Sequence, residues 1–409
     1  MALIMRFEEF LHLPNFFYRC VGLVLWGPSG GLWQRLFFHF SVHNLFLTFL
    51  AELYFIVVSF KTDLIEATMS LSYASYVAVA LVKYYYMLRR KKNMIIFLQR
   101  LEVIFPRTKL QQESLRLSHY LQLSKFVTKS YTAMYMVLIS IYNLYAIGTR
   151  LIYTNWLHVN VIDPTLPYSA SYPWNWHDHW SYYVLYVSQG LAGWHATCTQ
   201  MALDLLLCTS ATQLIMHYDY ISLSLEKHKS KYAEVYALDV PQRVRVVMEL
   251  KAFHEDMQYI SGIVAYHAEL LSLSQLLNEL FGVPLLVNLF TSSALICFLG
   301  FQLSVTRQLD LLIKIALFFF GSILQVYLIC HFGQLLTDSS TNVVNAVYFH
   351  DWIHADIRYQ KMLILIAKRA QRPAILNATN FISVSRGTMT DIMQLSYRIF
   401  ALIRTMYNE

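Results

Sequence analysis

The chain has 409 residues, of which 56% are hydrophobic and only 14% are charged, and its mean hydropathy is +0.41. This composition places it among membrane proteins with several spans and excludes an ordinary soluble domain. The formal net charge of +7 does not indicate nucleic-acid binding, because the basic residues lie at membrane edges and form no basic domain.

The first apolar stretch, residues 10–26, is too short to cross a bilayer and ends at the turn-forming residues 27–31. We interpret it as a re-entrant or interfacial helix within an N-terminal segment of residues 1–35. Glu8 and Glu9 lie where the apolar core of a signal peptide would begin, so the sequence does not indicate one.

Seven longer apolar stretches follow, and each is expected to be a membrane-spanning helix. They cover residues 36–60, 67–88, 130–152, 180–216, 280–303, 311–336 and 375–405. The fourth is too long for one crossing and should project from the membrane as helix.

The segments between the spans predict further helices. Residues 94–129 and 226–278 carry apolar residues at three- and four-residue spacing, and with residues 338–372 they should form a helical anchor domain in the cytoplasm. The predicted fold is therefore all-α. Helices one to six lie within 36–336, an anchor segment covers 337–374, and the seventh helix lies within 375–409.

The distribution of Lys and Arg predicts the orientation. Segments 1–35, 89–130, 226–280 and 337–373 together hold 24 of the 32 basic residues, and Arg89-Arg90-Lys91-Lys92 directly follows the second span. Because positive residues stay inside, the N-terminus should be cytoplasmic and the C-terminus extracellular.

Motifs for catalysis or metal binding are weak. His177-Asp178-His179 has ligand-type residues at i, i+2 spacing. Its neighbours Trp156, Trp174, Trp176 and Trp180 favour an interfacial aromatic belt. Without a zinc-protease, hydrolase or phosphate-loop motif, we expect no enzyme, no cofactor and no metal.

Two acids lie within predicted spans. Glu52 in the first and Asp204 in the fourth are functional candidates, because a charge inside the membrane is costly. The alternative, which we favour, is a buried hydrogen-bonded pair with Lys83 or a hydroxyl.

Aromatic residues recur on single faces in the outer halves of the spans and predict a cavity for a small, mostly apolar molecule. The candidate ligand-binding residues are Tyr73, Tyr76, Tyr142, Tyr145, Thr149, Tyr183, Val187, Gly190 and Phe319. Gly190 and Gly193 support a cavity, because a missing side chain between large ones leaves space or a close helix contact. Ordinary helix packing and lipid-facing aromatics are the alternative.

The last predicted span carries Arg386, Asp391, Arg398 and Arg404. Each charge at mid-membrane costs about 2.5–3.5 kcal/mol, whereas an apolar residue returns only about 0.5 kcal/mol. This helix should therefore face protein or water, which suggests a conduction pathway.

The C-terminal fifth closely resembles the signature region of insect odorant receptors. The resemblance lies in residues 330–352, 362–376 and 381–404, and includes Phe332-Gly333, Trp352, the block 369–373, and Ser396-Tyr397 with Phe400 and Leu402. Gustatory receptors usually end in a Thr-Tyr run closing on Gln-Phe, whereas Ser396-Tyr397 closes on Arg404 here. Residues 226–280 are too short for the insertion of the family's co-receptor, so the chain resembles a ligand-tuning subunit.

The resemblance implies an odorant-gated, non-selective cation channel formed as a heterotetramer with the co-receptor. Such a subunit would sit among lipids in the plasma membrane of olfactory neuron dendrites, bind a small volatile odorant, and bind no nucleic acid. A G-protein-coupled chemosensory receptor is the alternative, but it predicts an extracellular N-terminus and an Asn-Pro-x-x-Tyr motif that this sequence lacks.

Two opposite faces of the last helix are candidates for lining the pore. The polar arc comprises Arg386, Thr390, Asp391, Gln394, Arg398 and Arg404, and the apolar arc comprises Met389, Met393, Ser396, Phe400 and Ile403. Alignment of Ser396-Tyr397 with the family implies that Ser396, Phe400, Ile403 and Arg404 form the pore and gate. A gate that closes by dewetting also favours the apolar arc.

Overall fold

A computed structural model describes residues 4–27, 31–60, 64–155, 165–177, 179–236, 241–379 and 381–408. Within them the chain is almost entirely helical. The elements are α1 (Glu8–Cys20), α2 (Leu32–Ser59), α3 (Leu64–Arg89), α4 (Lys91–Val103), α5 (Lys109–Ser114), α6 (Leu117–Asn155), α7 (Ser181–Lys227), α8 (Lys231–Tyr236), α9 (Gln242–Val305), α10 (Leu309–Phe349), α11 (Ile357–Ala370), β1 (Asn377–Ala378), β2 (Ile382–Ser383) and α12 (Arg386–Asn408).

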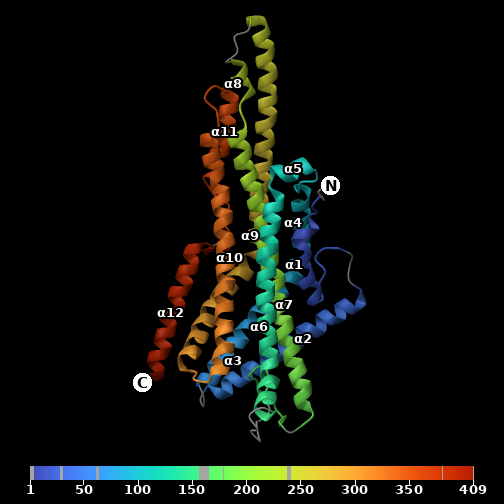
Figure 1. Ribbon diagram of the computed structural model, residues 1–409, viewed down its shortest axis with the longest axis vertical. Coiled ribbons are helices and arrows are strands. Elements are labelled where there is room, and N and C mark those ends of the chain that lie inside the picture. Colours follow the sequence, from blue (N-terminus) through green and yellow to red (C-terminus); the bar gives the residue numbers. More distant parts are fainter. Residues whose placement is uncertain are drawn as a thin grey trace.

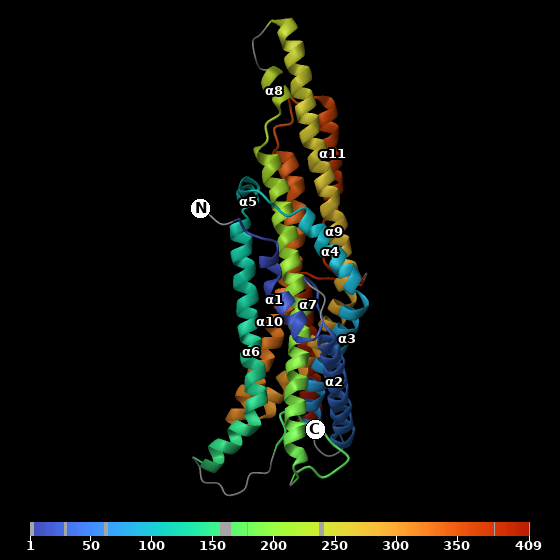
Figure 2. The same cartoon turned by 90° about the vertical axis from the view of Figure 1, so that its right-hand side faces the viewer.

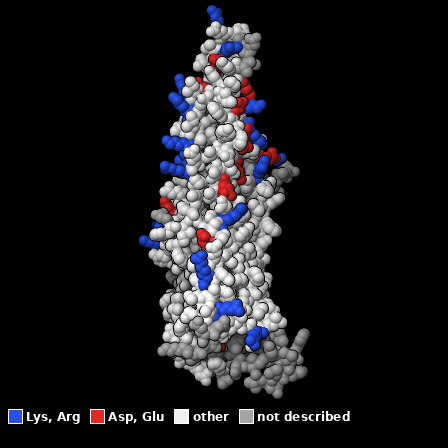
Figure 3. Space-filling view, turned by 90° about the vertical axis from the view of Figure 1, so that its left-hand side faces the viewer, with Lys and Arg blue, Asp and Glu red and all other residues white. Residues whose placement is uncertain are grey.

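The helices form one elongated bundle (Figure 1). α7, α9 and α10 run along most of its length and pack on one another, with α8 and α11 at one end and α2 and α3 toward the other. Figure 2 shows α6 beside α7 along the lower half. Lys, Arg, Asp and Glu lie more densely toward the end formed by α8 and α11 (Figure 3), as expected if that end is in water.

Long helices cross the boundaries between predicted spans and predicted cytoplasmic segments. α7 has 47 residues, α9 has 64 and α10 has 41. α9 begins directly after Pro241, whose fixed backbone angle suits a helix start, and continues past Pro284. The expectation that cytoplasmic helices continue the spans agrees with this arrangement.

Among the described residues, five helices are long and apolar enough to cross a membrane: α2, α3, α6, α9 and α10. α7 interrupts its apolar residues with buried Thr, Gln and His side chains, and α12 carries the charges noted above. The number of seven spans and their orientation therefore stay predictions.

The N-terminal helix packs against α7 and is followed by a tight turn. Gly22 has φ +80°, and a Cβ there would lie 2.7 Å from the backbone nitrogen of Phe38 at the start of α2. The predicted helix over 10–26 thus ends at Cys20. Residues 28–30 of the predicted turn lie outside the described part of the chain.

The prediction of one helix over 375–405 was wrong at its N-terminal end. Strands β1 and β2 pair antiparallel as a short hairpin, with Asn377 opposite Ser383, and α12 begins only at Arg386. Asn278 of α9 holds this segment, because its Nδ2 donates to the Ile375 carbonyl (2.7 Å) and its Oδ1 accepts from Asn377 N (3.0 Å).

Two glycines make room for the same hairpin. A Cβ on Gly282 would lie 3.1 Å from Thr379 N, and one on Gly333 would lie 2.2 Å from the Val384 carbonyl oxygen. The backbone at Thr379 therefore packs closely on α9, and the backbone at Val384 packs closely on α10. Apart from this hairpin, the all-α prediction is confirmed.

Candidate functional site

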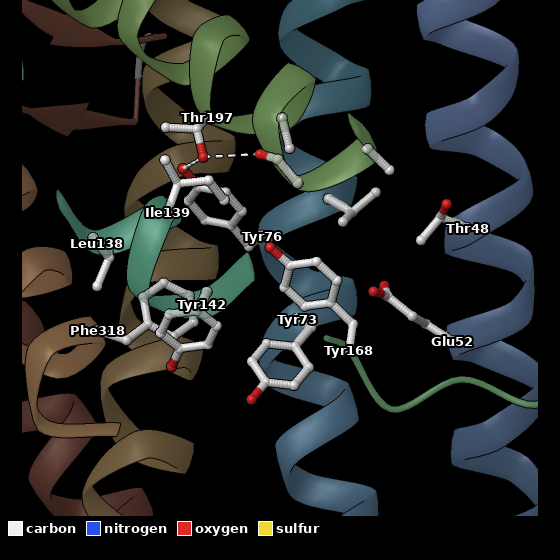
Figure 4. Close-up of a pocket in the computed structure, with 14 residues that line it drawn as sticks. Thr48, Glu52, Tyr73, Tyr76, Leu138, Ile139, Tyr142, Tyr168, Thr197 and Phe318 are labelled. Carbon is white, nitrogen blue, oxygen red and sulfur yellow. Dashed lines mark hydrogen bonds between the residues drawn. The ribbon is translucent and has the colours of Figure 1, made fainter. Parts of the chain in front are cut away.

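A cavity lies between the helices of the bundle, and we call it the bundle cavity (Figure 4). The space between its wall atoms, part of which is open to solvent, is about 500 Å³. Its walls come from α2, α3, α6, α7, α10 and the segment before α7. They comprise Thr48, Glu52, Tyr73, Tyr76, Val77, Leu138, Ile139, Tyr142, Tyr168, Ala192, Gly193, Ala196, Thr197 and Phe318.

Small residues on one face of α7 create the space. Ala192, Gly193 and Ala196 share this face, since residues three and four apart on a helix are neighbours. Tyr168 fills part of the room that they leave, because a Cβ on Gly193 would lie 2.2 Å from its hydroxyl oxygen. The sequence therefore shapes the cavity by pairing small side chains on α7 with a large one from the preceding segment.

Aromatic rings form most of the remaining wall. The Tyr73 ring lies edge-on to Tyr142 (5.9 Å between centroids) and Tyr168 (5.4 Å). Phe318 lies edge-on to Tyr76 (5.7 Å) and Tyr142 (5.5 Å). Such a wall offers a flat apolar ligand both faces and edges of rings to pack against.

Several polar atoms of the wall are already bonded within the protein. The hydroxyl of Tyr76 donates to Thr197 Oγ1 (3.4 Å), that of Tyr142 to the Lys314 carbonyl (3.3 Å), and that of Tyr168 to Asn143 Oδ1 (3.1 Å). These bonds hold the rings in place and leave the hydroxyls less available to orient a ligand than the sequence suggested.

Three of the nine predicted ligand-binding residues line the bundle cavity: Tyr73, Tyr76 and Tyr142. Tyr183 and Val187 instead lie on the outside of α7, 67% and 60% exposed. Tyr145 lies one turn beyond Tyr142, donates to Asp310 Oδ2 (2.9 Å), and lines a separate, more open cavity.

Two further predicted residues lie next to the cavity wall in sequence but are not part of it. Gly190 lies beside Asn143, while Gly193 is the glycine in the cavity wall. Phe319 packs against Gly300 of α9, and its neighbour Phe318 lines the cavity. The side chain of Thr149 lies outside the described residues.

Lys83 pairs with Asp204 and not with Glu52. Its Nζ lies 2.6 Å from Asp204 Oδ1, and Gln325 Nε2 donates to the other carboxylate oxygen (2.7 Å). The prediction of a buried pair is confirmed for Asp204, whereas Glu52 does not pair with Lys83 and its Oε2 has no hydrogen-bond partner among the described residues. Glu52 lies in the wall of the bundle cavity. The sequence signal for it was an acidic residue within a predicted span.

α12 packs its apolar arc against its own subunit. Ser396 is 2% exposed, and its hydroxyl lies 3.2 Å from that of Ser293 on α9. Phe400 and Ile403 are half-buried, whereas Arg404 is exposed. The rest of the polar arc is exposed as well: Arg386, Thr390, Asp391, Gln394 and Arg398.

The His177 motif lies in the segment before α7. The His177 ring stacks on Trp176 at 3.9 Å between centroids, which agrees with the aromatic-belt interpretation. Asp178 and Trp156 lie outside the described residues.

Comparison with known proteins gives the class to which this chain belongs. A family described as 7tm Odorant receptor matches residues 63–397. Odorant receptor 85c of Drosophila melanogaster is 37% identical over 405 residues, which cover 98% of this chain and 99% of the relative. Odorant receptor 85b of the same organism is 36% identical over 410 residues, covering 98% of this chain and 100% of the relative.

A solved structure has the same fold. The insect olfactory receptor OR5 from Machilis hrabei in complex with eugenol superposes with a TM-score of 0.77 at 14% sequence identity, covering 97% of this chain and 100% of that one. The fold and the matched sequence together define a multi-pass helical membrane receptor, not an enzyme. The chain belongs to the insect odorant receptor family.

Proposed function

We propose that this chain is the ligand-tuning subunit of an odorant-gated, non-selective cation channel. It binds a small volatile odorant in the bundle cavity and opens a central pore in a heterotetramer with a co-receptor. The assembly lies in the plasma membrane of olfactory neuron dendrites. The observation that carries this proposal is the small aromatic cavity within the helical bundle of an odorant receptor.

The cavity has a continuous physical connection to α12. Phe318 of the cavity wall neighbours Phe319, which packs on Gly300 of α9, and a Cβ on Gly300 would also lie 3.8 Å from Phe400 of α12. A ligand that moves Phe318 therefore acts on the same stretch of α10 and α9 that supports the last helix. Packed side chains with two arrangements are the means by which such coupling travels.

We further propose that α12 lines the pore with its exposed polar arc, including Arg404. In a single subunit the apolar arc is occupied by α9 and α10, so the exposed arc is the face free to meet water. Phe400 and Ile403 lie at the edge of that face and stay candidates for the gate. Ser396 faces α9, and its role is to hold the helix in register.

The proposal is tested by recording odorant-evoked currents from cells that express this chain with and without the co-receptor. Currents should require both subunits, persist when G-protein signalling is blocked, and shift to higher odorant concentration in Tyr73→Ala. A response that vanishes with G-protein signalling blocked contradicts the channel. A Tyr73→Ala variant with unchanged potency for every active odorant contradicts the cavity.

A further inference from the structure

The bundle cavity contains one acidic side chain, and its carboxyl group is not fully partnered within the described part of the chain. Glu52 is 1% exposed, and its Oε2 has no hydrogen-bond partner there. Figure 4 shows its carboxyl directed from α2 toward Tyr168 and Tyr73. A buried polar atom without a partner is destabilising, so such an atom calls for an explanation.

Nearby cations do not supply the partner. Lys83 is bonded to Asp204 (2.6 Å), and Lys314 Nζ lies 3.5 Å from the Pro167 carbonyl and 4.5 Å from the centre of the Tyr142 ring. The other polar side chain of the cavity on α2, Thr48, donates to the Asn44 carbonyl at 2.9 Å. Among the charged and α2 side chains of this wall, Glu52 is thus the described group with an atom left to bond a molecule inside the cavity.

The backbone around Glu52 is held in place. Ser70 Oγ donates to the Glu52 carbonyl (3.4 Å) and to the Ser169 carbonyl (3.1 Å), while Ser171 N donates to the Ala51 carbonyl (3.2 Å). These bonds join α2, α3 and the segment that carries Tyr168. The carboxyl therefore enters the cavity from a fixed base, as an anchoring group should.

We infer that Glu52 is the hydrogen-bond anchor of the odorant and that the cavity selects small alcohols over hydrocarbons of the same shape. A hydroxyl can both donate and accept, so it satisfies a carboxyl group at less desolvation cost than an ammonium. The tail of the alcohol packs against the rings of Tyr73, Tyr142 and Phe318. A site built to bond a hydroxyl rejects the analogue that lacks it, because its own polar group is then left unpaired. This inference rests on the proposed odorant cavity.

The test uses the channel with its co-receptor and the primary alcohols from butanol to octanol. Each alcohol is paired with the alkane in which a methyl replaces the hydroxyl, such as 1-hexanol with heptane. The best alcohol should be at least about tenfold more potent than its alkane, the size expected for one hydrogen bond to a buried group. Glu52→Leu should remove that difference by weakening the alcohol.

Matched variants separate this role from packing. Glu52→Gln keeps the shape and the bonding capacity and should retain most of the alcohol's potency. Ser75→Ala on α3 lies outside the cavity wall and should have no effect on alcohol preference, because its hydroxyl donates to the Leu71 carbonyl of its own helix (2.7 Å). Surface biotinylation shows whether each variant reaches the membrane, and potency is compared only at equal surface amounts.

The outcomes are distinguishable. If no alcohol activates the wild type, if alkanes match alcohols, or if Glu52→Leu leaves alcohol potency unchanged, Glu52 is not the anchor. When Tyr73→Ala still weakens the active odorants in that case, the cavity stands and only the anchor fails. When Tyr73→Ala and Glu52→Leu both leave every active odorant unchanged, the cavity itself is not the odorant site.

Discussion

Lys83 of α3 and Asp204 of α7 form an ion pair 2.6 Å long inside the bundle, with side-chain exposures of 2% and 7%. Gln325 of α10 donates to the same carboxylate, and the Tyr131 hydroxyl of α6 lies 3.4 Å from it. One carboxylate thus joins four helices two turns along α7 from Thr197 in the cavity wall. Removing one member of such a pair leaves an uncompensated buried charge.

We therefore predict that Lys83→Met destabilises the receptor by about 3–5 kcal/mol, the usual cost of breaking a buried pair from one side. Asp204→Leu should be similar, because it strands Lys83. The double variant should recover much of the loss, since both charges are gone. Thermal unfolding of the purified complex measures all three, and additive losses in the double variant would contradict direct pairing.

The cavity wall gives a second prediction. Tyr142→Ala should raise the half-maximal odorant concentration roughly 5- to 30-fold, which corresponds to about 1–2 kcal/mol for one lost aromatic contact. Tyr183→Ala is the control, because this tyrosine is exposed on the outside of the same bundle. Dose–response curves with the co-receptor present measure the half-maximal odorant concentration of each variant. Equal shifts in both variants would show that the effect does not come from the cavity.

The exposed face of α12 gives a third prediction. Arg404→Gln should raise single-channel conductance or divalent permeability, because a cation in a cation pore repels permeant ions by about 1 kcal/mol at 4 Å in bulk-like water. Phe400→Ser should raise current without ligand by easing wetting of the constriction. Ser396→Ala should leave conductance unchanged, since its hydroxyl faces α9. A conductance change in Ser396→Ala alone would place the pore on the opposite arc.

His350 lies at the end of α10, in the predicted anchor segment 337–374, and we predict that it makes the stability of the folded protein depend on pH. Its Nδ1 donates to the Leu225 carbonyl (2.8 Å), so its Nε2 accepts from the Tyr359 hydroxyl (2.9 Å). Burial lowers the pKa of His350, so the folded state binds a proton less readily than the unfolded chain. The stability that neutral His350 gives the folded state is complete above the ordinary histidine pKa of about 6.5. It is lost as the pH falls toward the lowered pKa.

The melting temperature of the purified complex should therefore fall between about pH 7.5 and pH 5.5, around the ordinary histidine pKa. His350→Gln should melt lower at the higher pH and show a weaker pH dependence. A variant with the same slope as the wild type would mean that other groups cause the fall.

The orientation can be tested directly. An epitope tag before Met1 should be hidden from antibody in intact cells, while a tag after Glu409 should be accessible, because 24 of the 32 basic residues then lie inside. Permeabilisation should expose both. Staining at Met1 in intact cells would reverse the predicted topology.

The helical fold could be predicted from sequence because apolar periodicity and charge placement are local signals. Helix ends and rotations were harder, because tertiary contacts decide them. Asn278 and Gly282 of α9 convert the start of the predicted last span into a hairpin, and neither lies near it in sequence.

The residues of the cavity wall could likewise be predicted from sequence only in part. Tyr73, Tyr76 and Tyr142 followed from aromatic spacing, while Phe318 and Gly193 each lie close in sequence to the residue predicted, because spacing fixes a face only to within about one turn. Tyr168 belongs to an irregular segment that carries no periodic signal. Glu52 is a candidate from sequence because it is an acid within a predicted span. Which of Glu52 and Asp204 pairs with Lys83, however, depends on distances in the folded structure.

The unbroken α9 has a consequence for how receptors on this scaffold can change length. A helix of 64 residues has a length along its axis of roughly 95 Å, at 1.5 Å per residue, even where it bends. One inserted residue between Asp256 and Ser293 would turn the two ends relative to each other by about 100°, so Ser293 would no longer meet Ser396. Loops can grow freely, but α9 can lengthen only by near-integral turns, such as seven residues, which fixes the spacing between the anchor end and the last helix.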